Sequence, residues 1–330
     1  MADLDVFGWA ADETGCGFYR IALPMQGLTG LGHRVAHSMK MPSEARDIPG
    51  TVIVGQRVCK PEPSKLWQQL AKQGRKLIYE VDDDLWNVDA SSPVAHEYFA
   101  RPEIRAALQR NIEVATAVTV TTDPLAERVA QWNPNVHIVP NAVPDWLVDH
   151  QPQQRDDGVL TIGWGGSATH AMDFDQVADQ LRRFLTRNPG TEFHCIGNNY
   201  ATWMRIPANR ARFTPWVANV EDFLRTIDYH VGIAPLRPHV FNQAKSALKA
   251  LEAGALGIPI VASAVRPYED YVWDGTTGYL VRRDHEWAAC LRSLAYEPDM
   301  RREMGMAARE QARQHTITQT APLWEKAILG

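Results

Sequence analysis

Two lysines, Lys245 and Lys249, stand four positions apart where an apolar run gives way to a helix-forming segment. On one helix they would project from the same face, one turn apart. Cations near the positively polarised start of a helix suit a diphosphate. Glu252 would follow two turns after Lys245 on that face, where its carboxylate can accept hydrogen bonds from a ribose. A plain solvated helix face is the alternative interpretation.

A glycine-rich segment from Gly163 to His170 follows a second apolar run. Gly165 and Gly166 allow backbone N–H groups to approach an anion closely, and the hydroxyl of Ser167 adds a donor. A tight turn with a Ser or Thr cap would explain the same residues without a ligand. Since parallel strands place their carboxyl ends at one edge of a sheet, we expect this loop to meet the start of the lysine helix.

Three consecutive carboxylates, Asp82, Asp83 and Asp84, come directly after the apolar run Lys76–Val81 and precede Trp86. Such crowding at a strand end raises a pKa, binds a metal ion or caps the next helix. The residues alone leave these three alternatives open. We expect one of the carboxylates, with Asp82 favoured, to orient or deprotonate a substrate hydroxyl.

An early loop, Thr14–Arg20, also follows an apolar run and opens a helix-forming segment, which would turn Gly15 and Gly17 toward a ligand site. Among the 11 tryptophans, Trp86, Trp164 and Trp216 lie at or near predicted strand ends, where sugars or bases can stack. Core packing explains most of the others.

The elements that must position these loops alternate between short apolar runs and helix-period segments, which predicts βαβ units and parallel sheets. In the first half the predicted strands are 4–9, 51–55, 76–81, 117–121 and 137–140, with helices at 18–29, 64–73 and 124–131. In the second half the predicted strands are 159–164, 192–197, 229–234 and 258–262, with helices near 173–187, 220–226, 242–255 and 284–296, then 300–314 and 318–328.

Length and composition favour two domains. A chain of 330 residues exceeds one ordinary core, and its 45% hydrophobic content is typical of globular proteins. The polar stretch 150–158 predicts the linker between an α/β domain at 1–150 and another at 151–330. We expect the last helices to pack back across the junction, with the final one reaching the N-terminal domain.

Several function classes are disfavoured. The four cysteines are far apart without metal-ligand spacing, so we expect buried free thiols. The net charge of -5 gives no global basic footprint for nucleic acid. The acidic start lacks the basic segment of a signal peptide, and no apolar run approaches the roughly 18 residues of a membrane span, which predicts a cytoplasmic protein.

The ordered set of motifs resembles the GT-B glycosyltransferases, and within them the retaining group around glycosyltransferase family 4, over nearly the whole chain. Its carriers are the glycine loop at 165–167, Phe241-Asn242, Lys245-Ser246, Lys249, Leu251-Glu252 and the segment 257–263. Gly15–Arg20, Gln56-Arg57, Asp82–Trp86 and Asn141 are similar to a subgroup common in bacterial polysaccharide clusters and bacteriophage genomes.

The resemblance implies two Rossmann-like, doubly wound domains facing a cleft, with a nucleotide sugar held mainly by the C-terminal one. It implies that Glu252 binds the donor ribose, whereas the family's partner glutamate falls on Ala244 and its Arg/Lys pair after strand 159–164 is absent. We expect Lys245 and Lys249 to supply that charge. The implied donor-binding set is Gly15, Gly17, Gly165, Gly166, Ser167, His170, Asn242, Ser246 and Glu252, and the acceptor-binding set is Tyr19, Arg20, Asp83 and Trp86.

The implied reaction is sugar transfer from a UDP- or GDP-sugar with retention of the anomeric configuration. Catalysis is assigned to Asp82, Asp84, Lys245 and Lys249, because cations must stabilise the departing diphosphate. No cofactor is expected, and a divalent metal is not expected to be essential although Asp82 and Asp84 resemble a metal-binding pair. A sugar-nucleotide epimerase and a non-catalytic nucleotide-sugar-binding module are the alternatives.

The acceptor is left open between a glycan or lipid-linked sugar, a protein side chain and a hydroxymethylated pyrimidine in phage DNA. A DNA acceptor requires a local basic surface, for which Arg101, Arg105 and Arg110 are the candidates. The outer face of one helix accounts for them equally well. The sequence does not determine the oligomeric state.

Overall fold

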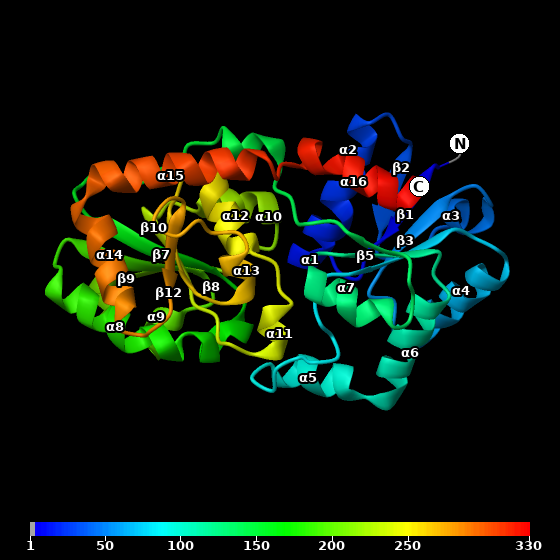
Figure 1. The fold of residues 1–330 in the computed structure, drawn as a ribbon, viewed down its shortest axis with the longest axis horizontal. Helices are drawn as coiled ribbons and strands as arrows, with labels where there is room; N and C mark the ends of the chain where they lie inside the picture. Colours follow the sequence, from blue (N-terminus) through cyan, green and yellow to red (C-terminus); the bar gives the residue numbers. More distant parts are fainter. Residues whose placement is uncertain (1–3) are drawn as a thin grey trace. The chain divides into compact units, whose positions relative to one another are not determined.

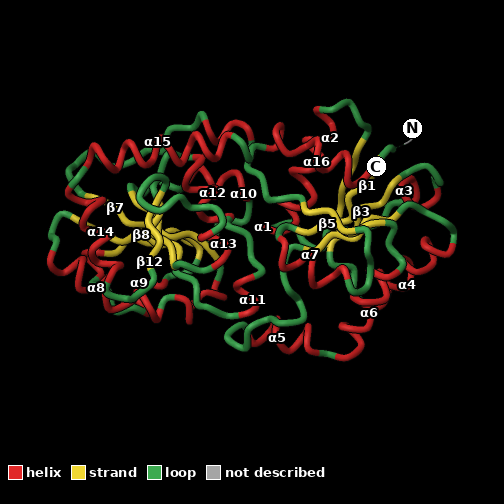
Figure 2. Tube along the Cα trace, viewed as in Figure 1, coloured by secondary structure: helices red, strands yellow, loops and turns green. Residues whose placement is uncertain are grey.

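The computed structural model describes residues 4–330 and divides into two compact units (Figure 1). The first unit comprises residues 1–144, 244–246 and 315–330, and the second comprises 145–243 and 247–314. Each unit is a parallel β-sheet with helices on both faces, as the strands and helices of Figure 2 show. The predicted α/β class with two doubly wound domains is confirmed.

The sheet of the first unit has the strand order β2-β1-β3-β4-β5-β6, with every pair parallel. Strand β2 was not predicted, because its residues are only partly buried and lack a continuous apolar run. The strands are β1 (Val6–Trp9), β2 (Val35–Ser38), β3 (Val52–Gln56), β4 (Leu77–Val81), β5 (Ala117–Val120) and β6 (Val136–Ile138).

Helices of the first unit begin repeatedly with proline near the first turn, where the missing N–H costs nothing. The last helix of the chain belongs to this unit, where Gly27 gives it room because an added Cβ would meet Ile317 at 2.8 Å. The helices are α1 (Gly15–Gly17), a π-helical turn (Phe18–Ala22), α2 (Leu23–Gly30), α3 (Ser43–Asp47), α4 (Pro61–Lys72), α5 (Pro93–Ala100), α6 (Pro102–Glu113), α7 (Asp123–Ala130) and α16 (Ile317–Leu329).

The sheet of the second unit has the order β12-β11-β10-β7-β8-β9, again all parallel. Strand β7 lies at the centre, so the loop that follows it leaves the middle of the sheet. The strands are β7 (Leu160–Gly166), β8 (Thr191–Gly197), β9 (Ala211–Pro215), β10 (Val231–Ala234), β11 (Ile260–Ser263) and β12 (Gly278–Val281).

The helices of the second unit differ from expectation at one place that matters for the site: the predicted helix 242–255 is split in two. The α-helices are α8 (Asp175–Arg187), α9 (Tyr200–Trp203), α10 (Val220–Thr226), α11 (Val240–Gln243), α12 (Leu248–Ala255), α13 (Arg266–Glu269), α14 (Glu286–Tyr296) and α15 (Pro298–Arg313), with 3-10 turns at Asp145–Val148, Ala168–Asp173 and Ala208–Arg210.

The break between α11 and α12 has a visible cause. Residues 244–246 belong to the first unit, where Ala244 is buried in the core and its carbonyl accepts a hydrogen bond from Thr122 Oγ1 at 2.8 Å. The Ala244 carbonyl therefore accepts a side-chain hydrogen bond from Thr122 rather than an i to i+4 hydrogen bond of a helix. Lys245 and Lys249 do not share a helix, so their predicted i, i+4 pairing was wrong, and Glu252 does not lie two helical turns after Lys245.

Candidate functional site

The glycine pair of the second unit forms the carboxyl end of β7 and the loop beyond it. Lys249, the second residue of α12, donates from Nζ to the carbonyl oxygen of Gly165 at 2.6 Å and lies over the Trp164 ring at 4.9 Å. An added Cβ at Gly166 would come within 2.8 Å of this Nζ. The absence of a side chain at Gly166 therefore leaves room for the Lys249 ammonium group at the end of β7. Lys249 contacts the loop and is not a solvated surface residue.

The segment after the glycines is fixed by a buried tyrosine. Tyr200 Oη donates to the carbonyl of Ser167 at 3.1 Å and accepts from the N–H of His170 at 3.0 Å. Burial raises the pKa of Tyr200 to about 12, so the phenol keeps its proton. Ser167 Oγ lies 2.9 Å from Thr169 Oγ1. Two hydrogen bonds to the first residue of α9 thus fix the loop at 167–170.

Asp173 organises the other side of this loop, although the sequence did not single it out. Its carboxylate lies 2.8 Å from His170 Nδ1 and accepts hydrogen bonds from the N–H of Arg237 at 3.0 Å and from Asn242 Nδ2 at 3.3 Å. Asn242 is 4% exposed and also donates to the Arg237 carbonyl. The structure places His170 and Asn242 in a network that shapes the site from within.

Glu252 lies on α12 three residues after Lys249, on the same helical face. It is 7% exposed, so its carboxyl group is largely buried. Burial, and next the charge of Glu252, raise the pKa of Tyr229 well above its usual range. Burial, then the charges of Asp173 and Glu252, do the same for the pKa of Tyr268. A carboxylate and an ammonium group one turn apart beside a glycine loop can bind both the hydroxyl and phosphate groups of a nucleotide.

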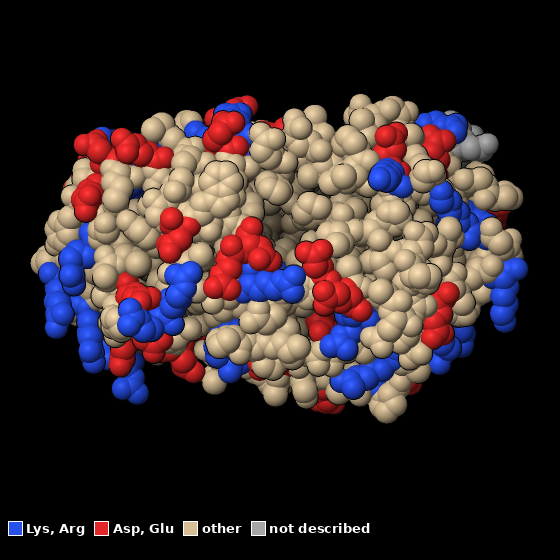
Figure 3. Space-filling view, viewed as in Figure 1, with Lys and Arg blue, Asp and Glu red and all other residues tan. Residues whose placement is uncertain are grey.

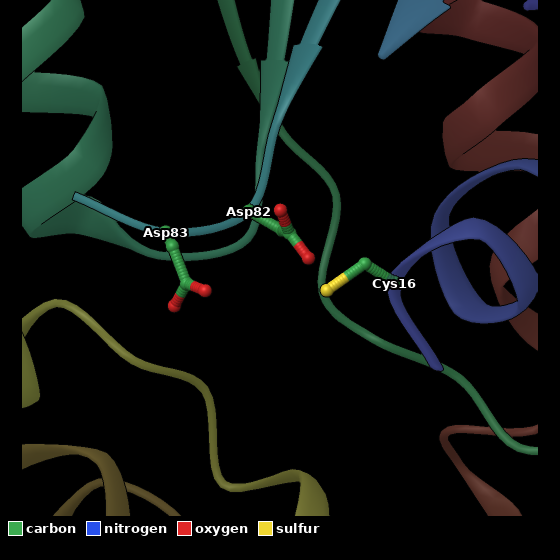
Figure 4. A group of neighbouring side chains, drawn as sticks. All are labelled: Cys16, Asp82 and Asp83. Atoms are coloured by element: carbon green, nitrogen blue, oxygen red, sulfur yellow. The ribbon is translucent and has the colours of Figure 1, made fainter. Parts of the chain in front are cut away.

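In the first unit, Cys16, Asp82 and Asp83 gather where β4 ends, with ligand atoms within 4.8 Å of one another. Figure 4 shows the Asp82 carboxylate and the Cys16 thiol turned toward each other, with Asp83 on the same loop. Burial and then the charge of Asp82 raise the pKa of Cys16 well above its usual range, so the thiol stays neutral. Lys245 reaches Asp83, with Nζ 3.7 Å from Oδ1.

Arg57 lies close to this cluster, and only the family resemblance points to it in the sequence. It follows β3 with a φ of 47°, a left-handed backbone that is strained for a residue with a side chain. Its guanidinium forms an ion pair with Asp12. Although burial opposes the effect, the Arg57 charge and the N–H groups of Thr14 and Gly17 lower the pKa of Asp12.

The glycines of the early loop have different surroundings. The N–H of Gly17 donates to Asp12 Oδ1 at 3.1 Å, and an added Cβ at Gly17 would clash with the Asp12 carbonyl. An added Cβ at Gly15 meets nothing within 4 Å. Gly17 is therefore required by packing, and Gly15 is open on its side-chain face.

Two further residues assigned to chemistry make contacts within the first unit. Asp84 is 3% exposed, and it accepts hydrogen bonds from Asn87 Nδ2 at 2.7 Å and from the N–H of Trp86 at 3.3 Å, which is the geometry of a local turn. Trp86 packs on Trp132 at a centroid distance of 4.6 Å. These contacts correct the assignment of Asp84 to catalysis, whereas the half-buried Trp86 stays a predicted acceptor-binding residue.

Tyr19 and Arg20 are likewise buried, at 4% and 1% exposure, and cannot present side chains to an acceptor. Arg20 donates from Nε to Glu80 Oε1 at 2.7 Å and from Nη1 to the Val139 carbonyl at 2.8 Å. Its guanidinium also lies 4.6 Å from the Trp324 ring centroid. Arg20 joins four segments of the first unit, which corrects its assignment as an acceptor-binding residue.

Asn141 and Ser246 are hydrogen bonded to each other, with Asn141 Nδ2 donating to Ser246 Oγ at 2.8 Å. Asn141 Oδ1 also accepts from Arg20 Nη1 at 3.1 Å. Ser246, assigned to the donor, therefore lies with Lys245 in the first unit rather than on α12.

A metal ion fits this cluster poorly. Within residues 4–330 only the group of Cys16, Asp82 and Asp83 has the proximity that a metal site requires. Magnesium prefers oxygen ligands, and a thiol must lose its proton to bind a metal. The neutral Cys16 thiol and the adjacent Arg57 and Lys245 cations oppose that chemistry.

Helix hydropathy and surface charge are the two properties that concern a membrane or nucleic-acid partner. No helix within residues 4–330 combines the length and apolar character of a membrane span. On the face drawn in Figure 3, the basic side chains of the described residues are interspersed with acidic ones.

Comparison with known proteins finds similarity to glycosyltransferases, and the family match lies mostly in the second unit. Residues 159–296 match the family model described as "Glycosyl transferases group 1". The chain is similar to D-inositol 3-phosphate glycosyltransferase of Kribbella flavida, with 44% identity over 184 residues. That match covers 53% of this chain and 37% of the relative, so the chain corresponds to well under half the length of that protein.

Solved structures resemble the chain over nearly its whole length. HepE from Anabaena, in complex with UDP and glucose, gives a TM-score of 0.69 at 12% identity and covers 99% of each chain. WaaG, described as a glycosyltransferase involved in lipopolysaccharide biosynthesis, gives 0.65 at 15% identity, covering 98% of this chain and 99% of that one. Together with the two parallel six-stranded sheets, these similarities show the GT-B fold that the sequence predicts.

Proposed function

We propose that this chain is a glycosyltransferase that moves a sugar from a nucleoside diphosphate sugar to an acceptor hydroxyl. The observation that carries the proposal is the position of Lys249, held on the Gly165 carbonyl at the start of α12, with the buried Glu252 one turn further on. The proposal assigns the donor to the second unit and the acceptor to the first.

The donor phosphates belong, on this proposal, beside the glycine loop. The Lys249 ammonium group, the N–H groups at 166–168 and the start of α12 are positive groups that stabilise the diphosphate as it leaves. Glu252 accepts from the ribose hydroxyls. HepE has been solved with UDP, which supports a UDP-sugar as the first donor to test, with GDP-sugars as the second.

Trp216 is proposed as the platform for the donor base. It follows β9 and is 53% exposed, which is unusual for so large an apolar side chain. An added Cβ at Gly197, the last residue of β8, would lie 3.2 Å from its ring, so the indole stands beside the carboxyl ends of the sheet. An exposed aromatic face at that edge suits base stacking.

We expect Trp216→Ala to weaken UDP binding at least fivefold, because stacking of a base on an aromatic ring contributes about 1–3 kcal/mol. Calorimetric titration of UDP measures the effect. Trp273→Ala is the matched control, since Trp273 is 60% exposed in the same unit and follows a helix rather than a strand. Equal affinities for the two variants would contradict the base assignment.

For the acceptor, we propose that Asp82 and Asp83 orient the attacking hydroxyl while Lys245 adds positive charge. The family resemblance favours retention of the anomeric configuration by a same-face reaction, which needs no strong base. The anomeric proton of the product, measured by NMR, tests this outcome, and an inverted product would overturn it.

Transfer is proposed to proceed without a metal, since Lys249 and Lys245 supply the cationic charge that a metal otherwise provides. We expect turnover with a UDP-sugar to be unchanged in excess EDTA. A loss of activity in EDTA that added Mg²⁺ or Mn²⁺ restores would show that the Cys16, Asp82 and Asp83 cluster, or another site, binds an essential metal.

A glycan or lipid-linked sugar is the acceptor that this proposal favours over DNA. Of the three candidate arginines, Arg105 donates to the carbonyls of Phe99 and Trp86, and Arg101 pairs with Glu97 at 3.5 Å. These two guanidinium groups therefore already interact with groups of the protein, which leaves less positive charge for DNA phosphates. Labelled donors offered separately with glycolipid, glycan and hydroxymethylated DNA decide the class.

The same assay separates the remaining functions. Interconversion of the donor without any acceptor would identify an epimerase. Donor binding without hydrolysis or transfer would identify a binding module, an alternative that stems from the alanine at position 244 where the family has a glutamate.

A further inference from the structure

Three arginines of the second unit line one cavity between helices α8 and α14. The cavity has a volume of about 140 Å³, and its polar lining consists of Gln180, Asn188, Arg183, Arg187 and Arg292, with no acidic side chain among the described residues. Several basic side chains lie beside one another at the left edge of Figure 3, where Figure 1 places these two helices. Pockets for whole drug-sized ligands have volumes of about 300–1,000 Å³, so this cavity suits one small group.

The guanidinium groups of these arginines are exposed, and within residues 4–330 none of them forms an ion pair or a hydrogen bond. The carboxylates of the two helices are paired elsewhere or distant. Asp179 accepts from Arg182, which does not line the cavity, at 2.6 Å. Glu286 accepts from Arg283 at 2.8 Å, and Asp175 lies in the first turn of α8, about 12 Å along the helix from the nearest of the three arginines. Three positive charges therefore share this cavity without a carboxylate partner.

Repulsion among these charges disfavours the arrangement in the absence of an anion. Arg183 and Arg187 stand four positions apart on α8, where their side chains are neighbours, and like charges at this spacing destabilise a helix. Arg292 adds a third positive charge from α14. A bound anion offsets this repulsion.

The carboxyl end of α8 does not account for the arginines. Its last carbonyls carry partial negative charge, but the Phe184 carbonyl accepts from Asn188 Nδ2 at 2.6 Å, and the Asn188 carbonyl accepts from Arg210 Nη2 at 2.6 Å. Gln180 has no side-chain hydrogen bond within residues 4–330, so its amide adds a donor to the cavity. The three guanidinium groups and this amide are donors that a ligand can use.

The number of donors selects among anions. A guanidinium group binds the oxygens of a carboxylate or a phosphate in a two-pronged geometry. Three such groups, which come from two helices, exceed what the two oxygens of one carboxylate can accept in that geometry. A phosphomonoester presents three terminal oxygens and a charge of about −1.5 to −2 at pH 7, so it matches the cavity in both oxygens and charge.

The cavity lies at the opposite end of the sheet from the proposed donor site. Arg187 is the last residue of α8, and the N–H of Thr191, the first residue of β8, donates to the Asn188 carbonyl at 3.1 Å. The cavity is therefore near the amino end of β8, whereas the glycine loop follows the carboxyl end of β7. The 13 residues of α8 between these two ends span about 20 Å.

We propose that this cavity binds the phosphate group of a phosphomonoester through Arg183, Arg187 and Arg292, at a site separate from that of the donor. This binding goes beyond the proposed function and does not depend on it. A soluble phosphomonoester and the headgroup of a phosphomonoester lipid present the same chemistry, and the experiment distinguishes the two sources.

The first measurement is a titration of methyl phosphate into the full chain, followed by phosphorus NMR. We expect the double variant Arg183→Gln/Arg187→Gln to weaken binding by about tenfold or more, because two charge-assisted contacts are lost. Arg292→Gln should weaken binding as well. Arg182→Gln is the matched control, since Arg182 is on the same helix and pairs with Asp179, and it should bind as the unmodified chain does. Thermal unfolding checks that each variant is folded.

A further variant separates the two sites. Lys249→Ala, at the proposed donor site, should leave the binding of methyl phosphate to the arginine cavity unchanged. No binding of methyl phosphate to the unmodified chain, or an equal loss in Arg182→Gln and the double variant, would overturn the proposal whether or not the chain transfers sugar.

Vesicles identify the source of the phosphate. The full chain is sedimented with phosphatidylcholine vesicles that contain either phosphatidic acid, whose headgroup is a phosphomonoester, or phosphatidylserine, whose headgroup is not. Sedimentation with phosphatidic acid alone, lost in the double variant, would assign the cavity to the lipid headgroup. Any other vesicle result, with binding of methyl phosphate intact, would assign it to a soluble phosphomonoester.

Discussion

Lys249→Ala is expected to lower kcat/KM by at least tenfold while the protein remains folded. The ammonium group of Lys249 lies at the glycine loop, which is the proposed site of the diphosphate that gathers negative charge as the sugar departs. A charge-assisted interaction with the leaving group is stronger in the transition state than in the ground state, so its loss should reduce kcat and not only raise KM. Steady-state kinetics with a UDP-sugar measure both constants.

Lys326→Ala is the control for this prediction, because Lys326 is exposed on α16 in the first unit. Its kinetics should match those of the unmodified chain, and thermal unfolding should show that both variants are folded. Near-normal kinetics for Lys249→Ala would remove the central residue of the proposed donor site.

Arg20→Met is expected to reduce the free energy of unfolding by about 3–5 kcal/mol, the range for breaking a buried ion pair. Arg20 and Glu80 are 1% and 0% exposed, so methionine would leave the glutamate without its cation in the core. The hydrogen bonds to Val139 and Asn141 would also be lost. Urea unfolding at about pH 9, above the pKa of about 8 of the Glu80 carboxyl, measures the change.

Arg34→Met provides the comparison, since the Arg34–Asp5 pair is solvent-exposed and such pairs contribute about 0–1 kcal/mol. If Arg20→Met cost no more than Arg34→Met, the structural role assigned to Arg20 would be wrong.

The Glu80 carboxyl adds a pH dependence to this core. Burial raises its pKa to about 8, while the Arg20 charge acts in the opposite direction. The folded chain therefore holds this proton more tightly than the unfolded chain, where the ordinary value is 4.5. This contribution to stability is full below about pH 4.5 and is lost as the pH rises through about 8.

Much of the fold follows from sequence patterns, because buried parallel strands consist of short runs of apolar residues. Strands such as Leu77–Val81 and Val231–Ala234 fall where the runs predict them. Strand Ala211–Pro215 does not, since it lies at the sheet edge and alternates partly exposed residues without an apolar run. Edge strands need less burial, so the pattern carries less information about them.

The sequence indicated which residue types belong to the candidate site better than it indicated how those residues are arranged in space. Helix propensity runs unbroken through residues 242–255, yet the burial of Ala244 in the first unit divides the segment. Tertiary packing of this kind overrides local propensity and cannot be deduced from a single sequence. Asp173 and Tyr200 were missed for a related reason, because their importance arises from hydrogen bonds to residues far along the chain.

Burial also separates residues that look alike in the sequence. Asp82, Asp83 and Asp84 are consecutive, but Asp84 turns inward to cap its own loop while its neighbours gather with Cys16. Nothing in three identical side chains indicates which will turn inward.

The most direct test of the account is a crystal structure of the full chain with UDP bound. We predict that the diphosphate lies against the loop at residues 165–167 and the Lys249 ammonium group, with the ribose at Glu252 and the base on Trp216. A diphosphate bound instead beside Asp82 and Asp83 would contradict it.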